Sequence, residues 1–259
     1  MGKYILYTFQ LVLTIVLTVE LCAQEAVHPI YKEGFYPNKK LRYKGMFIGK
    51  EPVGEVTHYT PEGKLKAVMK HASDTTDAIL YSKDEKHSTS GRYIRRKKTG
   101  AWEYRFGERL LMKEEYKADL LDGKSIRYDN QGNVAEIKTW KEGNLHGDWT
   151  LCYPDGTIRC AASYKEGKLE GTLKSYSHDG RLSVEGTYKN NLKDGTWRYY
   201  TPDGKLKDEI HYTNGVASNR KEIEMKENEE VNRILRNSRN IPDPANFLND
   251  PEVYMRYSE

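Results

Sequence analysis

The chain has 259 residues, of which 37% are hydrophobic and 31% are charged, and its formal net charge at pH 7 is +4. So few hydrophobic residues argue against a conventional two-layer domain, whereas 20 tyrosines, 4 tryptophans and 21 glycines argue against disorder, which is poor in aromatic residues. The mild net charge makes no case for nucleic-acid binding. Aromatic residues punctuated by glycines favour short strands joined by tight turns.

Residues 1–23 have the composition of a signal peptide. Lys3 precedes a largely apolar run, and Ala23 offers a small residue at the expected cleavage point. The run is shorter than the about 20 apolar residues of a membrane-spanning helix. We therefore expect an exported bacterial protein, periplasmic, outer-membrane-associated or secreted, with residues 24–33 as a short leader. The alternatives are an uncleaved anchor and a lipoprotein modified at Cys22, although Glu20 and Leu21 are not the small residues that lipidation prefers.

A repeat of 23 or 24 residues follows over residues 34–215. Each unit opens with a glycine, and one degenerate unit near Asp77 fills the double-length first interval. An aromatic residue stands seven positions before the glycine, and an aliphatic residue stands eleven positions after it. Three columns in one register make chance a poor explanation. The glycines are Gly54, Gly100, Gly123, Gly147, Gly171 and Gly195; the aromatic residues are Phe47, Tyr93, Tyr116, Trp140, Tyr164, Tyr188 and Tyr212; the aliphatic residues are Leu65, Leu111, Val134, Ile158, Leu182 and Leu206.

Each unit reads as a β-hairpin. Pro-Asp-Gly at 154–156 and 202–204 is typical of a hairpin turn, and Lys-Glu-Gly at 165–167 supplies the turn at the opposite end. Because an isolated hairpin is marginally stable, neighbouring units should stack and let the aromatic and leucine columns cover one another. We predict an all-β fold, an elongated single-layer antiparallel sheet of about seven hairpins. Units 77–99 and 100–122 depart from the pattern, so a bulge or loop is expected to interrupt the ladder there.

The segments Tyr-Lys-Glu-Gly-Lys-Leu-Glu-Gly at 164–171 and Gly-Thr-Trp-Arg-Tyr-Tyr-Thr-Pro-Asp-Gly-Lys-Leu at 195–206 resemble MORN repeats. The resemblance is strongest to the bacterial variant found in exported proteins and in a group labelled YwqK-like antitoxins. It implies a MORN-like β-hairpin sheet that binds proteins, dimerises or associates with membranes. The signal peptide argues against an antitoxin that neutralises a cytoplasmic toxin.

Residues 216–259 differ from the repeats. The stretch 218–238 is charged and free of glycine and proline, with Ser218 as helix N-cap and Val231, Ile234 and Leu235 as a short apolar stripe. We predict a short helical segment that caps the sheet or docks a partner; the alternative for the last 15 residues is a solvated tail.

Catalytic, cofactor and metal-binding motifs are not found in the sequence. The glycines follow the hairpin period, and the histidines are scattered over different units. Cys152 is predicted to lie opposite Ile158 and only diagonal to Cys160, about 7–8 Å between Cβ atoms, which favours two thiols over a disulfide. The sequence therefore predicts a protein that is not an enzyme and needs no cofactor.

The predicted function is an exported, non-catalytic scaffold that binds a protein partner, or a second copy, in the cell envelope. The first alternative is a peripheral binder of anionic lipids, and the second is an antitoxin-like protein. The basic run at 92–98 could attract an anionic surface, and its competing interpretation is a solvated hairpin turn. The candidate contact residues are Arg92, Arg95, Arg96, Lys97, Lys98, Tyr116, Trp140, Tyr164 and Tyr188.

Overall fold

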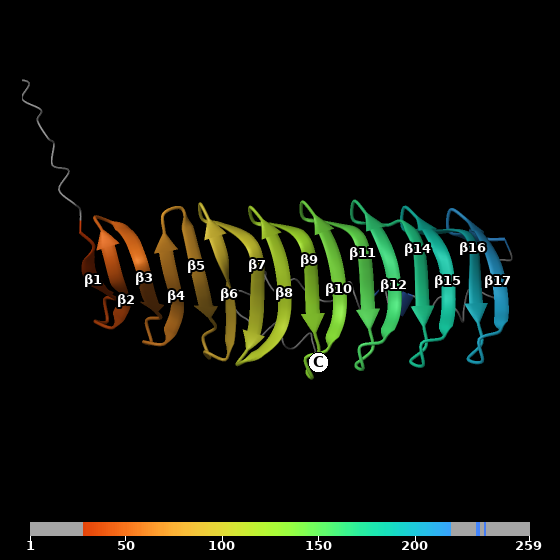
Figure 1. The fold of residues 1–259 in the computed structure, drawn as a ribbon, viewed down its shortest axis with the longest axis horizontal. Helices are drawn as coiled ribbons and strands as arrows, with labels where there is room; N and C mark the ends of the chain where they lie inside the picture. Colours follow the sequence, from red (N-terminus) through yellow and green to blue (C-terminus); the bar gives the residue numbers. More distant parts are fainter. Residues whose placement is uncertain (1–27, 219–231, 234–235, 237–259) are drawn as a thin grey trace, which may run out of the picture.

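The computed structural model describes residues 28–218 together with Asn232, Arg233 and Arg236. The described strands form one open antiparallel sheet in which they pair in chain order, side by side from β1 to β17 (Figure 1). The predicted single-layer hairpin sheet is confirmed. The strands span Ile30–Phe35 (β1), Leu41–Ile48 (β2), Glu51–Tyr59 (β3), Leu65–Ala72 (β4), Thr75–Tyr81 (β5), His87–Ile94 (β6), Lys97–Phe106 (β7), Arg109–Lys117 (β8), Leu120–Tyr128 (β9), Val134–Lys141 (β10), Asn144–Cys152 (β11), Ile158–Lys165 (β12), Lys168–Leu169 (β13), Gly171–Tyr176 (β14), Leu182–Lys189 (β15), Leu192–Tyr200 (β16), Leu206–Thr213 (β17) and Val216–Ala217 (β18).

The two kinds of predicted turn lie at the two long borders of the sheet. In the turn between β16 and β17, Gly204 has a φ of 82° and its N–H donates to the carbonyl of Thr201 at 2.8 Å. At the opposite border, between β12 and β13, Glu166 and Gly167 both have positive φ, 51° and 77°. Two consecutive left-handed residues match the twist of paired strands. The turns therefore lie where the sequence predicted them.

The glycine that opens each unit has a different role, which is to form a β-bulge. Gly195 has a φ of 74°, and the register between β15 and β16 shifts between Glu185 and Thr187. A Cβ atom at Gly195 would meet nothing within 4 Å, so the left-handed backbone, and not a lack of space, requires glycine there. The repeat period thus reflects two turns and one glycine bulge per unit.

One expectation about the ladder is met in part and another needs correction. The expected bulge is present, since the register shifts between Ser90 and Arg92 and between Tyr104 and Arg105, but no loop interrupts β5–β9 and most other strand pairs shift register too. The aliphatic column does not join the core throughout, since Ile158 is 47% exposed and Leu206 is 53% exposed. Both residues are the first of their strands and follow a turn directly, at the border of the sheet.

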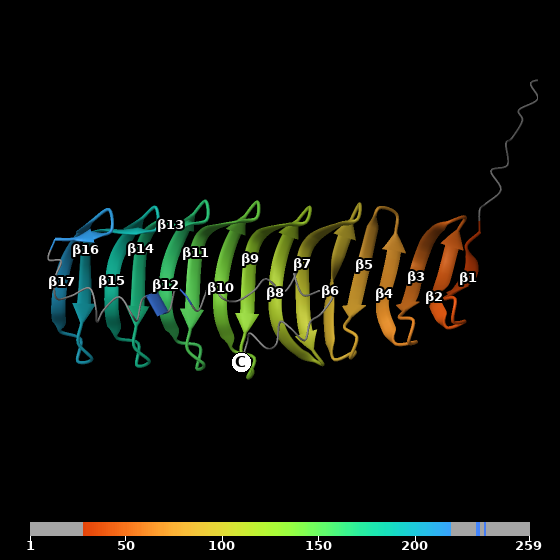
Figure 2. The same cartoon turned by 180° about the vertical axis from the view of Figure 1, so that it is seen from behind.

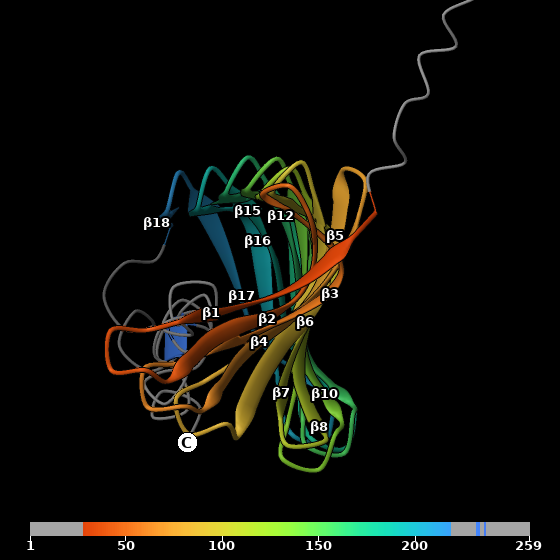
Figure 3. The ribbon, with the colours of Figure 1, turned by 90° about the vertical axis from the view of Figure 1, so that its left-hand side faces the viewer.

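The alternation of side chains gives the sheet two chemically different faces. The buried tryptophans and tyrosines share one face, which we call the ring-rich face; the other is the outer face. Figure 3 looks along the row of strands and shows a sheet that is twisted and curved, so one side is hollow.

The larger core cluster runs from β11 to β18, and a smaller one lies on β7 and β8. The predicted C-terminal helix falls almost entirely outside the described residues; Asn232, Arg233 and Arg236 are helical. Among the described residues, no helix is long and apolar enough to cross a membrane.

Candidate functional site

Three tryptophans anchor the ring-rich face. Trp102, Trp149 and Trp197 each stand two residues after an opening glycine and are 0%, 1% and 0% exposed. Tyrosines from neighbouring strands meet them edge-on: Tyr188 and Tyr212 flank Trp197 at centroid distances of 5.1 and 6.1 Å. Such edge-to-face pairs stabilise beyond the area they bury. Three of the four aromatic residues predicted as partner contacts, Tyr116, Tyr164 and Tyr188, therefore belong to the core.

Lys193 lies inside a cage of these aromatic rings. Its Nζ is 4.5 Å from the ring centroid of Trp197 and 4.8 Å from that of Tyr212, and it donates to the Tyr199 hydroxyl at 3.1 Å. The side chain is only 8% exposed. A desolvated ammonium over two ring faces gains cation–π stabilisation.

Lys98 occupies an equivalent cage. Its Nζ is 4.6 Å from the centroid of Trp102 and 4.7 Å from that of Tyr116, and it lies 3.4 Å from the Tyr104 hydroxyl. Here a carboxylate is added, because Glu114 is the strand partner of Trp102 and accepts a hydrogen bond from Tyr116 at 2.7 Å. Burial, with the nearby negative charge of Glu114, raises the pKa of Tyr104 far above its usual range.

A second buried carboxylate continues this polar region onto β10. Glu136 is 3% exposed and accepts the indole N–H of Trp149 at 2.7 Å. Lys138 Nζ lies 3.2 Å from one oxygen of Glu136, and Arg127 Nε lies 3.7 Å from the other. A buried charge persists only when it is paired and hydrogen-bonded. Strands β8–β10 therefore carry a polar region that lies between the two core clusters.

Sequence reasoning missed both the cages and these carboxylates. The signal was present, since Lys-x-Gly-x-Trp-x-Tyr occurs at 98–104 and again at 193–199. In the units between them, the lysine position holds Leu121, Leu145 and Leu169. A lysine at the position that holds leucine in neighbouring units therefore indicates a buried cation among the aromatic rings.

The structure does not gather the basic run at 92–98 into one patch. Arg92 lies on the outer face and forms an ion pair with Asp77 at 2.6 Å, which holds the pKa of that carboxyl below its usual range. Arg95 and Arg96 form the β6–β7 turn with positive φ, and Lys97 is exposed beside them. Lys98 alone points into the ring-rich face. The four candidate aromatic residues also lie on that face, Trp140 half-buried and Tyr116, Tyr164 and Tyr188 buried.

The outer face carries a row of alternating charge over β3–β6. Glu55 is opposite Lys70, Lys70 is opposite Asp77, and Asp77 is opposite Arg92. The row borders an open hollow of about 720 Å³ whose apolar lining includes Val68 and Ile79. Opposite charges on facing strands stabilise their pairing modestly.

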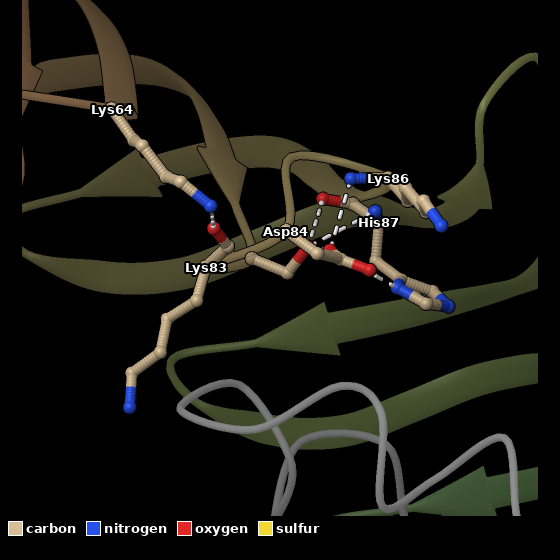
Figure 4. A network of polar contacts seen from close by, with 6 residues as sticks. Lys64, Lys83, Asp84, Lys86 and His87 are labelled. Atoms are coloured by element: carbon tan, nitrogen blue, oxygen red, sulfur yellow. Dashed lines mark hydrogen bonds and ion pairs between the residues drawn. The ribbon is translucent and has the colours of Figure 1, made fainter.

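The degenerate unit keeps its turn by a local polar network (Figure 4). Lys86 N–H donates to Asp84 at 3.0 Å, and Lys64 Nζ reaches across from the preceding hairpin turn to the carbonyl of Lys83 at 2.8 Å. Burial raises the pKa of Asp84, but hydrogen bonds from Ser82 and Lys86 outweigh it and leave that pKa below its usual value. The lysines therefore have a structural role here.

The cysteines are placed as predicted. Cys152 pairs with Ile158, whereas Cys160 pairs with Leu151 on the ring-rich face, and both thiols are free. Burial raises the pKa of Cys160 to about 12, so its thiol stays protonated. Within the described strands and turns, no group of three or more histidine, cysteine or acidic side chains is placed to hold a metal ion.

Comparison with known families now adds to this geometry. The family described as "MORN repeat variant" matches residues 169–190 and 193–214, which are the last two complete hairpin units. These two units are therefore similar in sequence to a MORN-type repeat. MORN repeats are a non-enzymatic module that generally binds proteins or membranes. A search of curated proteins finds no match to the chain.

Proposed function

We propose that this MORN-type protein is an exported, non-catalytic scaffold that binds another protein in the bacterial cell envelope. The observation that carries the proposal is the first edge of the sheet. Among the described strands β1 pairs with β2 alone, and three of its large apolar side chains are exposed, Ile30 at 63%, Tyr31 at 54% and Phe35 at 57%. An edge strand offers unpaired backbone groups to a strand of a partner, and natural sheets usually protect such edges.

The proposal is tested by cross-linked affinity capture from envelope fractions, followed by mass spectrometry. The edge variant Tyr31→Lys/Phe35→Lys places charges where a partner strand would pack, so a stoichiometric partner should be lost. Its matched control is Leu206→Lys, which adds a charge at a comparably exposed position on β17. Equal recovery with both variants, or background proteins alone with a monomeric sedimentation profile, would contradict the proposal.

Anionic membrane lipid is the second candidate, and the β6–β7 turn favours it. The side chain of Arg95 is 84% exposed and lies 3.6 Å from Asp74, and Arg96 and Lys97 are exposed next to it. Each such cation contributes about 1 kcal/mol at an anionic surface. Salt-sensitive flotation with anionic liposomes should be lost in Arg95→Glu/Arg96→Glu and kept in Lys165→Glu/Lys168→Glu. No flotation at low salt would eliminate this candidate.

A further inference from the structure

The edge strand β1 carries a carboxylate that faces a cation on one side only. Among the described strands, Glu33 on β1 is opposite Lys44 on β2, and its other side is the open edge of the sheet. The carboxylate accepts a hydrogen bond from the Tyr31 hydroxyl at 3.0 Å. The ammonium of Lys44 lies 5.9 Å from the ring centroid of Tyr59. The edge therefore presents an exposed negative charge to whatever strand pairs with it.

A complete position of the same kind lies near the other end of the row. Glu185 on β15 is opposite Lys174 on β14 and opposite Arg198 on β16, and Arg198 Nη1 lies 3.6 Å from its carboxylate. Figure 2 shows β14–β16 and β1 towards opposite ends of the row. Opposite charges that face each other on paired strands are stabilising. A second cation, opposite Glu33, would complete the edge in the same way.

Large apolar side chains flank Glu33 on the same face. Tyr31 and Phe35 stand two residues before and after it and are 54% and 57% exposed. Alternate residues of a strand point to one face. The register from β1 to β4 connects Glu33 with Val68, so this face of β1 belongs to the outer face. The edge thus offers an apolar, an acidic and an apolar position in a row.

We propose that β1 binds an antiparallel strand of a partner that carries lysine or arginine opposite Glu33 and large apolar side chains opposite Tyr31 and Phe35. Such a strand has the pattern apolar–x–cation–x–apolar, because side chains two positions apart share a face. β1 pairs antiparallel with β2, so an antiparallel partner extends the same ladder. The inference rests on the proposed function, since it specifies the partner that binds this edge.

The charges of β1 disfavour a second copy of the same strand. Two copies that pair antiparallel and keep the same face outward place one residue opposite its own copy, because side chains alternate between the faces. In the registers with the largest overlap of β1, that residue is Lys32 or Glu33. Like charges directly opposite each other on paired strands are destabilising. A symmetric dimer through β1 is therefore disfavoured.

A head-to-tail contact between copies is disfavoured for the same reason. In the register that joins β15 to β16, Glu185 faces Arg198. Glu209 holds on β17 the place that Glu185 holds on β15, and Glu33 holds on β1 the place that Arg198 holds on β16. Addition of β1 to the β17 of another copy in this register would set Glu33 against Glu209. The charge pattern therefore favours a different protein over a second copy.

Binding of short peptides tests the strand pattern. The probe is a fluorescein-labelled Thr-Thr-Ile-Thr-Lys-Thr-Ile-Thr-Thr peptide, and its counterpart has glutamate at the centre. In fluorescence anisotropy, residues 24–259 should bind the lysine peptide about fivefold more tightly than the glutamate peptide. Glu33→Lys should reverse this preference and Glu33→Gln should abolish it. The control Glu108→Lys makes the same charge change in the exposed β7–β8 turn and should keep the original preference.

Two outcomes of the peptide experiment would overturn the proposal. The first is that the lysine peptide does not bind the unchanged chain. The second is that the preference between the two peptides is the same in the unchanged chain and in Glu33→Lys.

Sedimentation velocity tests the exclusion of second copies. The unchanged chain should be monomeric, whereas Lys32→Thr/Glu33→Thr removes both opposing charges and should dimerise. Addition of Tyr31→Lys/Phe35→Lys to that variant should restore the monomer, which would assign the dimer to β1. A dimer of the unchanged chain that Tyr31→Lys/Phe35→Lys dissociates would overturn the proposal.

The inference and the proposed function can fail separately. Charge-selective peptide binding without a partner captured from envelope fractions would contradict the proposed function alone. Capture of a partner that the edge variant loses, together with peptides that bind regardless of their central charge, would overturn this inference alone.

Discussion

The two lysine cages are built from the same local sequence but sit in different surroundings. In both, a lysine precedes the bulge glycine, a tryptophan and a tyrosine follow it, and the distances from Nζ to the rings agree within about 0.1 Å. They differ at the strand partner of the tryptophan. Trp102 faces Glu114, whereas Trp197 faces Ile210.

That difference shows that two separate features of the sequence determine each cage. Spacing along one strand sets the geometry of the cage, while the residue on the next strand decides whether the surroundings are polar or apolar. The Lys98 cage accordingly opens into the polar region of β8–β10, and the Lys193 cage belongs to the larger apolar cluster.

The largest expected effect is the loss of stability when the tryptophan of either cage is replaced by alanine, and it should differ between the two cages. Replacing a buried tryptophan by alanine costs about 3–5 kcal/mol. Trp197→Ala should lie at the upper end, because Trp197 packs in the larger cluster and its indole N–H donates to the Thr187 carbonyl at 3.1 Å. Trp102→Ala should lie at the lower end. Guanidinium unfolding followed by circular dichroism measures both, and a larger loss for Trp102→Ala would break the comparison.

The next effect tests whether the charges of the Lys98 cage depend on each other. Glu114→Ile copies the residue of the other cage and should destabilise by about 1–3 kcal/mol, because it removes the buried carboxylate that accepts the hydrogen bond of the Tyr116 hydroxyl. Lys98→Leu/Glu114→Ile copies the leucine column as well. The double variant should be more stable than the sum of the single losses predicts, by about 1 kcal/mol or more. Strict additivity in this double-mutant cycle would show that the two residues act independently.

A smaller effect distinguishes two glycines within the Lys193 cage. A Cβ atom at Gly186 would lie 2.1 Å from the indole of Trp197, whereas one at Gly195 would meet nothing but requires a φ of 74°. Gly186→Ala should cost about 2 kcal/mol through overpacking. Gly195→Ala should cost about 1 kcal/mol through backbone strain alone. The same denaturation assay checks the order, and near-ultraviolet circular dichroism should change for Gly186→Ala alone.

The smallest effect lies outside both cages, on β3 and β4. Burial lowers the pKa of His58, helped by His71 and nearby cations, and burial lowers the pKa of His71. Below the ordinary value of 6.5, the unfolded chain therefore binds protons before the folded chain does, and the free energy of unfolding falls as the pH falls. The difference between the urea midpoints at pH 7.5 and pH 5 should be smaller in His58→Gln/His71→Gln than in the unchanged chain. The local stability of the cages should not change with these substitutions, which hydrogen exchange can check.

Much of the fold was predictable because its determinants are local. Turn residues such as Asp203 and Gly204, and the bulge glycines, impose a backbone geometry that a single sequence reveals. The candidate site was harder, since its chemistry depends on pairs across strands. The position of Lys98 within a basic run concealed its burial, and only the β7–β8 register brings Glu114 opposite Trp102. The aliphatic column misled for a related reason: its period was real, but its position after the turn placed Ile158 and Leu206 at the border.

The chain-order pairing of the strands also makes the molecule a spacer of defined length. Strands about 4.8 Å apart separate β1 from β17 by about 70 Å, so objects held at the two ends stay a fixed distance from each other. Because each described strand pairs only with its neighbours in the row, gain or loss of one hairpin would change that separation by about 10 Å without redesign of the rest. One hairpin is therefore the unit in which the length of the sheet can change.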